Sequence, residues 1–182
     1  MAIDQIASCL KRHDKQHRDV YEQEHRIGQL VERLGNIRSY ICTEDKSFAG
    51  DKPRVDLYVE TEKGHVLVEL KLCITSGGTL GRQLLSKVVS TLENLMSRSP
   101  ASVKDADVLV VVPRGTSLER VCNYLIRGLT AELRAADINI GADTKCAPSL
   151  AYQGAYVLRT RRPIALKIGN NMVKLIFHIL AI

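Results

Sequence analysis

The segment from residue 54 to residue 73 constrains the fold more than any other part of the chain. Two runs rich in apolar residues, Arg54–Thr61 and His65–Cys73, flank the short turn Glu62–Gly64, which predicts a β-hairpin. Because side chains alternate across a strand, Glu69 and Lys71 share one face of the second strand. The other face carries only apolar side chains, Val66, Val68, Leu70 and Leu72. The hairpin therefore has one apolar face and one face with an acid and a base.

The pattern on either side of the hairpin predicts an α/β domain. Ile3–Leu34 has helical character, as two helices or as one helix with a charged middle. Further helices are predicted at Thr79–Ser97 and Ser117–Ala136, and further strands at Ile37–Thr43, Asp107–Val112, Tyr156–Thr160, Ile164–Ile168 and Met172–Ile182. We expect a mixed central β-sheet flanked by helices. The last strand is too apolar for a free edge, so it is either covered by the core or used in self-association.

Size and charge narrow the class of protein. A chain of 182 residues, 45% of them hydrophobic, is long enough for one well-buried core and too short for two ordinary domains. We therefore expect one domain over residues 1–182. Lys and Arg outnumber Asp and Glu by 26 to 20, and the net charge of +6 favours association with polyanions such as DNA, RNA or an acidic membrane surface. Aromatic residues make up only 4%, so contacts with a nucleic acid would depend mainly on charge.

The spacing of the cysteines and the length of the apolar runs bear on the cellular compartment of the protein. Five cysteines are widely spaced and form no C-x-x-C pair, so neither a disulfide framework nor a zinc cluster is predicted. The N-terminus lacks the apolar core of a signal peptide, and no apolar run approaches the roughly 20 residues that span a bilayer. We expect a soluble protein in the reducing cytoplasm.

The charged face of the hairpin has a chemical use. The tight turn brings the first strand back beside the second, so that Asp56 can lie near Glu69 and Lys71. Two carboxylates can hold Mg²⁺, which polarises a phosphodiester and activates water, while a lysine orients that water or stabilises the developing negative charge. The alternative is structural: Glu69 and Lys71 form an exposed strand pair, and Asp56 is a surface residue near a turn.

The D-x(12)-E-x-K pattern of Asp56, Glu69 and Lys71, on a hairpin between two helices, resembles the PD-(D/E)xK, or restriction-endonuclease-like, nucleases. The resemblance covers about residues 20–113, leaves a β-rich extension at about 154–182, and is closest to the archaeal Holliday-junction resolvases. It implies a restriction-endonuclease-like core, Asp56 and Glu69 as metal ligands and Lys71 as the residue that assists hydrolysis. Mg²⁺ is the implied cofactor, with Mn²⁺ able to substitute. The sequence departs from the pattern at Pro53, which stands three residues before Asp56 instead of next to it.

The first helix offers a third acid. Val20, Ile27, Val31 and Leu34 form its apolar stripe, and Glu24 falls within that stripe. A carboxylate on a buried helix face is costly unless a metal or another cation compensates it. Resolvase-like nucleases resemble this arrangement, which implies Glu24 as an additional metal ligand, with Glu22 as the second choice. Alternatively, Glu24 lies at the rim of the stripe and is solvated.

The helix after the hairpin carries polar residues that the same resemblance implicates. Gln83 and Lys87 lie one turn apart, where related enzymes place a Gln or a Lys near the phosphate. We therefore expect both to bind the substrate backbone, although a solvated helix face would explain them as well. Gly77 and Gly78 are interpreted as a loop that either lets a nucleic acid approach closely or only turns the chain.

The sequence thus predicts a Mg²⁺-dependent endonuclease that hydrolyses DNA phosphodiester bonds. The resemblance to resolvases further implies selectivity for DNA structures such as junctions. The resemblance also implies a symmetric homodimer, with the apolar C-terminal strand as a candidate element of the interface. Two rivals remain: a catalytically inactive nucleic-acid-binding protein of the same fold, and an RNA-directed or defence nuclease. Substrate specificity resides in loops and dimer geometry, which one sequence does not reveal.

Overall fold

The computed structural model describes residues 2–13, 21–42, 52, 54–71, 77–98, 103–135, 145–148 and 157–181. Within them, eight strands form one sheet in the order β1-β2-β3-β4-β8-β6-β5, with β7 also paired to β8. The strands are β1 (Ile37–Cys42), β2 (Leu57–Thr61), β3 (Gly64–Leu70), β4 (Asp105–Val112), β5 (Cys146–Pro148), β6 (Val157–Thr160), β7 (Ile164–Ile168) and β8 (Asn171–Ala181). β4 runs parallel to both β3 and β8, and the other pairings are antiparallel. The predicted mixed sheet is confirmed.

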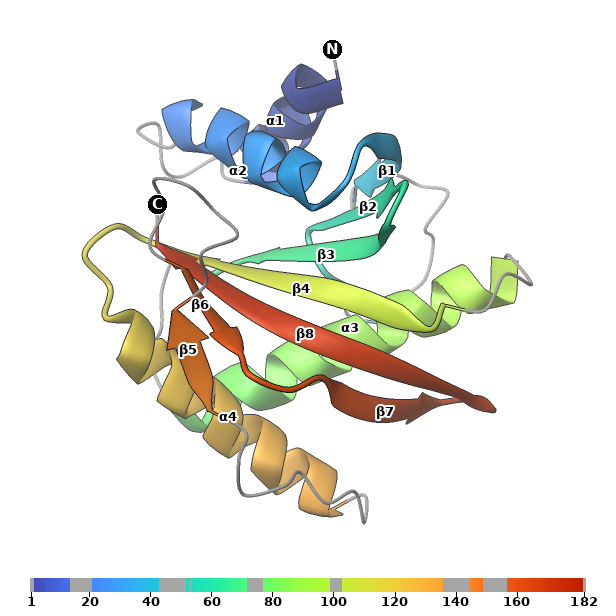
Figure 1. Cartoon of the computed structure of the whole chain (residues 1–182), viewed down its shortest axis with the longest axis vertical. Helices are drawn as coiled ribbons and strands as arrows, with labels where there is room; N and C mark the ends of the chain where they lie inside the picture. Colours follow the sequence, from blue (N-terminus) through green and yellow to red (C-terminus); the bar gives the residue numbers. More distant parts are fainter. Residues whose placement is uncertain are drawn as a thin grey trace.

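Helices cover both faces of this sheet (Figure 1). α1 (Ala2–His13) and α2 (Tyr21–Leu34) pack on the face that carries Val66 and Val68 of β3. α3 (Gly77–Arg98) and α4 (Leu118–Ala135) pack on the opposite face, which carries Leu67. Each helix buries an apolar stripe, with Leu84, Val88 and Leu92 on α3 and Leu125, Leu129 and Leu133 on α4 fully or almost fully buried. The strands at the centre are therefore mainly apolar on both sides, as is typical of strands between two helical layers.

The hairpin lies where the sequence pattern places it. β2 and β3 pair in an antiparallel register from Leu57 opposite Val68 to Thr61 opposite Gly64. β3 begins directly after the turn at Gly64, whose φ of 151° is a backbone conformation that glycine adopts without steric cost. The hairpin prediction is confirmed, and it fixes which side chains of the two strands stand opposite each other.

Two interpretations of the sequence are corrected. Gly77 and Gly78 belong to the first turn of α3 and do not form a loop. β8 is an interior strand, paired with β4 on one side and with β6 and β7 on the other, so its apolar character reflects burial in the core. It has no free edge along the paired residues and does not serve as a dimerisation strand there. The short strand β5 was not predicted, because three residues carry too little periodicity to detect.

The prediction that the cysteines form no disulfides was wrong. Disulfides join Cys9 of α1 to Cys42 of β1, and Cys122 of α4 to Cys146 of β5, with Cα–Cα distances of 6.0 Å and 6.3 Å. These pairs are separated by 33 and 24 residues, and spacing in the sequence does not reveal which cysteines the fold brings together. Among the helices that the structure describes, none combines the length and apolarity needed to cross a bilayer.

α3 and α4 touch backbone to backbone at a pair of glycines. A Cβ placed on Gly81 would lie 2.6 Å from the Cα of Gly128 and 2.6 Å from the backbone nitrogen of Leu129. A Cβ on Gly128 would lie 2.7 Å from the Cα of Gly81. Because both neighbours are backbone atoms, a side chain here forces the helices apart instead of displacing a flexible group.

We expect Gly81→Ala to destabilise the protein by about 1–3 kcal/mol through overpacking. The loss should occur even though alanine favours an isolated helix by about 1 kcal/mol over glycine. Thermal unfolding measures it, as a fall in Tm of roughly 2–4 °C for each kcal/mol. The exposed Asn123→Ala on α4 is the control and should change stability by no more than about 0.5 kcal/mol. A Gly81→Ala variant as stable as the wild type would contradict the close helix contact.

Candidate active site

The register of the hairpin brings Asp56 beside Glu69. The paired register ends with Leu57 opposite Val68, so one step further along the ladder Asp56 stands opposite Glu69. The Oδ2 atom of Asp56 accepts a hydrogen bond of 2.7 Å from the backbone N–H of Leu70. Lys71 is held just beyond the strand, because its backbone N–H donates to the carbonyl of Val111 on β4 at 2.8 Å. The predicted convergence of Asp56, Glu69 and Lys71 is therefore present.

Glu69 is the centre of the cluster. Its side chain is only 1% exposed, on the face of the sheet that α3 covers. The Nζ atom of Lys71 lies 3.1 Å from its Oε1 atom, and the Nζ atom of Lys87 on α3 donates a hydrogen bond to the same oxygen. A buried carboxylate requires such cationic partners, because an isolated charge is very costly in a medium of low dielectric constant.

The surroundings of Glu69 act on the pKa of its carboxyl group in two opposite directions. Burial raises the pKa of its carboxyl group above the ordinary value, and the charge of Asp56 raises that pKa further. Lys87 and Lys71 act in the opposite direction, by their charges and by the hydrogen bond from Lys87. The upward causes outweigh the downward ones, so the two lysines compensate the buried charge only in part.

The second oxygen of the Glu69 carboxylate differs from the first in having no partner among the described residues. This Oε2 atom is buried and accepts no hydrogen bond from any residue that the structure describes. Buried polar atoms normally have a partner, and a carboxylate oxygen beside a second carboxylate is the donor set that hard divalent cations prefer. The residues present therefore fit Mg²⁺, which commonly uses one or two protein carboxylates and fills its remaining positions with water and substrate phosphate.

The described part of the chain gathers no cluster of three or more His, Cys, Asp or Glu side chains that could hold a metal. Glu22 and Glu24 lie in the first turn of α2, and their side chains are outside the described residues. The apolar stripe of α2 is confirmed at Ile27 and Val31, which are buried against the opposite face of the sheet from Glu69. The assignment of a metal ligand to this helix stays a prediction.

α3 contributes two contacts that the sequence did not predict. Lys87 bonds to Glu69, whereas the sequence suggested only a phosphate contact for it. Thr91 lies one turn further and is 1% exposed; its hydroxyl donates to the carbonyl of Lys87 at 2.7 Å and accepts from the N–H of Val55 at 3.2 Å. Thr91 thus ties the residue before Asp56 to the helix that carries Lys87. The signal in the sequence was a polar residue, Thr91, within the apolar stripe of α3 and one turn after Lys87.

Gln83 lies one turn before Lys87 on α3 and is exposed to solvent. It is therefore available to a large ligand that approaches Glu69 along the helix. No described contact joins Gln83 to Asp56, Glu69 or Lys71, so its predicted role in substrate binding stays a prediction.

Comparison with known proteins adds no relative: no family model, no curated protein and no solved structure matches this chain.

We expect Thr91→Val to destabilise the protein by about 1–3 kcal/mol, because it removes the hydroxyl that accepts from the N–H of Val55 and donates to the carbonyl of Lys87. Valine has nearly the same shape as threonine, so the loss reports on these hydrogen bonds. Urea unfolding monitored by circular dichroism measures the loss. Thr91→Ser keeps the hydroxyl group and serves as the control, with a smaller effect. Equal stability of Thr91→Val and the wild type would show that the tie between α3 and Val55 contributes nothing.

Proposed function

We propose that this protein is a metal-dependent endonuclease of the PD-(D/E)xK kind that hydrolyses DNA phosphodiester bonds with Mg²⁺. One observation carries the proposal: the Glu69 carboxylate is buried beside Asp56, receives Lys71 and Lys87 on one oxygen, and has no described hydrogen-bond donor on the other. An acid pair with two amines at the end of a strand has the groups that phosphodiester hydrolysis needs. The net charge of +6 supports a polyanionic substrate.

Each residue then has a role. Asp56 and Glu69 hold the metal, with Glu24 as the proposed additional ligand, and the bound Mg²⁺ supplies Lewis-acid activation of the phosphodiester and of water. Lys71, fixed at its backbone to β4, orients the attacking water and stabilises negative charge on the phosphate. Lys87 can exchange its contact with Glu69 for one with a phosphate oxygen, and the exposed Gln83 extends the phosphate-binding row along α3.

A nucleic-acid-binding protein without catalysis is the second candidate, and one observation favours it. Lys71 and Lys87 both approach the same oxygen of Glu69, which is also how a purely structural cluster of ion pairs compensates a buried acid. In that case the carboxylates would hold α3 against the sheet and would not bind a cation. The two candidates differ in their response to divalent metal and to substitution of Glu69.

We expect the wild type to cleave DNA in the presence of Mg²⁺ or Mn²⁺ and to lose this activity in EDTA. Glu69→Gln and Lys71→Ala should each lower the cleavage rate by about 10²-fold or more, because each removes a group that acts on the reacting phosphate. The substrates to compare are supercoiled, linear, single-stranded and four-way-junction DNA, with RNA as the arm that tests the alternative substrate.

Lys104→Ala is the matched control for Lys71→Ala. Lys104 is exposed and precedes β4, whereas Lys71 follows β3, which runs parallel to β4, so the two lysines lie at opposite ends of these strands. Its rate should equal that of the wild type. Cleavage that persists in EDTA or in both active-site variants would defeat the proposal, and binding of DNA without cleavage of any substrate would favour the second candidate.

Metal binding should also depend on pH in a defined direction. The raised pKa of Glu69 means that the folded protein holds this proton more tightly than the unfolded chain, so the stability that protonation confers is present at low pH and is lost as pH rises through the raised pKa. Mg²⁺ must displace the proton, so its stabilising effect should grow over the same rise.

At a concentration about 100 times its dissociation constant, Mg²⁺ should stabilise the folded protein by about 2.7 kcal/mol, which raises Tm by roughly 5–11 °C for a chain of this size. The shift should be larger at pH values above the raised pKa of Glu69 than at pH values below it. Thermal unfolding with and without Mg²⁺ measures it, and Glu69→Gln should abolish it. A shift that is the same in Glu69→Gln would place the cation elsewhere.

A further inference from the structure

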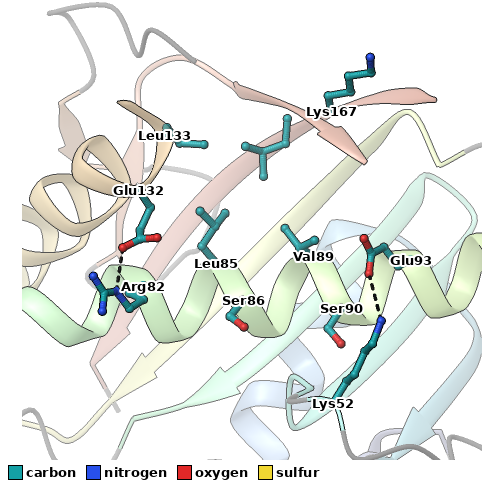
Figure 2. Close-up of a pocket in the computed structure, with 11 residues that line it drawn as sticks. Lys52, Arg82, Leu85, Ser86, Val89, Ser90, Glu93, Glu132, Leu133 and Lys167 are labelled. Atoms are coloured by element: carbon teal, nitrogen blue, oxygen red, sulfur yellow. Dashed lines mark hydrogen bonds and ion pairs between the residues drawn. The ribbon is translucent and has the colours of Figure 1, made fainter. Parts of the chain in front are cut away.

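A groove of about 550 Å³ runs along α3 (Figure 2). Lys87 is not among the residues that line it. Its floor is apolar and comes from three elements: Leu85 and Val89 of α3, Leu133 of α4 and Leu166 of β7. Leu133 and Leu166 are buried, whereas Leu85 and Val89 are half-buried and keep surface open to the groove.

Ion pairs stand at the two ends of this groove. At one end the Nε atom of Arg82 lies 2.7 Å from Oε1 of Glu132. At the other end Nζ of Lys52 lies 4.0 Å from Oε2 of Glu93. Figure 2 shows these two pairs on opposite sides of the apolar floor. Each end therefore presents both a positive and a negative group to an incoming surface.

The charged and small residues of α3 along this groove form a stripe that complements itself. Arg82, Ser86, Val89 and Glu93 follow one another at intervals of four, three and four residues, which places them on one side of the helix. When the stripe is read in the reverse direction, Glu93 takes the place of Arg82 and Val89 takes the place of Ser86. A second α3 that lies antiparallel across a two-fold axis thus sets each arginine opposite a glutamate.

We propose that this groove is the interface of a two-fold symmetric dimer, with α3 packed antiparallel against α3 of a second copy. Arg82 pairs with Glu93 of the second copy, and the axis passes between Ser86 and Val89. The small side chains of Ser86 and Ser90 let the helices approach closely, while Leu85 and Val89 supply the apolar contact. The inference does not rest on the proposed nuclease activity.

Charge complementarity favours a second copy of this chain, packed antiparallel, as the partner at this groove. In the dimer each end of the interface carries an alternating row of four charges: Glu132, Arg82, then Glu93 and Lys52 of the second copy. A row of alternating charges is more stabilising than an isolated surface pair, and it fixes the orientation of the partner. A parallel arrangement would set like charges together at each end, which disfavours it.

Analytical ultracentrifugation across a dilution series tests the proposal. The wild type should dimerise, and Arg82→Glu and Glu93→Arg should each weaken the dimer by about tenfold or more, because each substitution creates two repulsive contacts across the axis. An equimolar mixture of the two variants should restore association to near the wild-type affinity, since the heterodimer again sets opposite charges against each other. Circular dichroism and thermal unfolding verify that each variant is folded.

The mixture is the decisive measurement. New repulsion inside one chain, such as that between the carboxylate introduced at position 82 and Glu132, remains in the mixture, so only pairing between chains can restore the dimer. Glu119→Arg, at an exposed position on α4 that does not line this groove, is the control and should leave the dimer unchanged. A wild type that is monomeric throughout, a dimer that resists both charge reversals, or a mixture that fails to associate would each overturn the proposal.

Discussion

The burial of the Glu69 carboxylate is the interaction on which the rest of the arrangement depends. An acid that is 1% exposed can carry its charge only where cations and hydrogen-bond donors replace water. That requirement draws Lys71 from the end of β3 and Lys87 from α3 to the same oxygen. It also couples the position of α3 to the register of the hairpin, because Thr91 on α3 holds Val55 while Asp56 accepts the N–H of Leu70.

The topology of the sheet determines at which end of the strands the cluster of Asp56, Glu69 and Lys71 lies. Glu69 and Lys71 lie at the carboxyl end of β3, which runs parallel to β4, and Asp56 enters the same end because β2 runs antiparallel to β3. Open α/β sheets bind ligands beyond the carboxyl ends of their parallel strands, where side chains emerge from the core toward solvent. Glu69 is buried at this end of the sheet and Asp56 is half-buried beside it, an arrangement that suits the metal-dependent hydrolysis proposed for the pair.

Three sides of α3 make three different kinds of contact. Leu84, Val88 and Leu92 bury against the sheet, Lys87 and Thr91 serve the acid cluster, and Leu85 with Val89 floors the groove proposed as a dimer interface. Gly81 adds a backbone contact with α4 that sets how closely the two helices approach. A helix constrained on so many sides leaves little freedom for the groups it positions, and such rigidity favours a preorganised site.

Alternation in residues 54–73 and helical periodicity in α3 and α4 are local properties. The sequence by itself therefore determined those elements, the hairpin, and the placing of Glu69 and Lys71 on one face near Asp56. Only the tertiary structure decided that β8 lies between β4 and β6, that Lys87 reaches Glu69, and that the four paired cysteines meet. These contacts join residues far apart in the chain, and their partners are selected by packing of the apolar faces and by compensation of the buried charge. Neither is encoded in the spacing of residues along the sequence, so no periodicity could have revealed them.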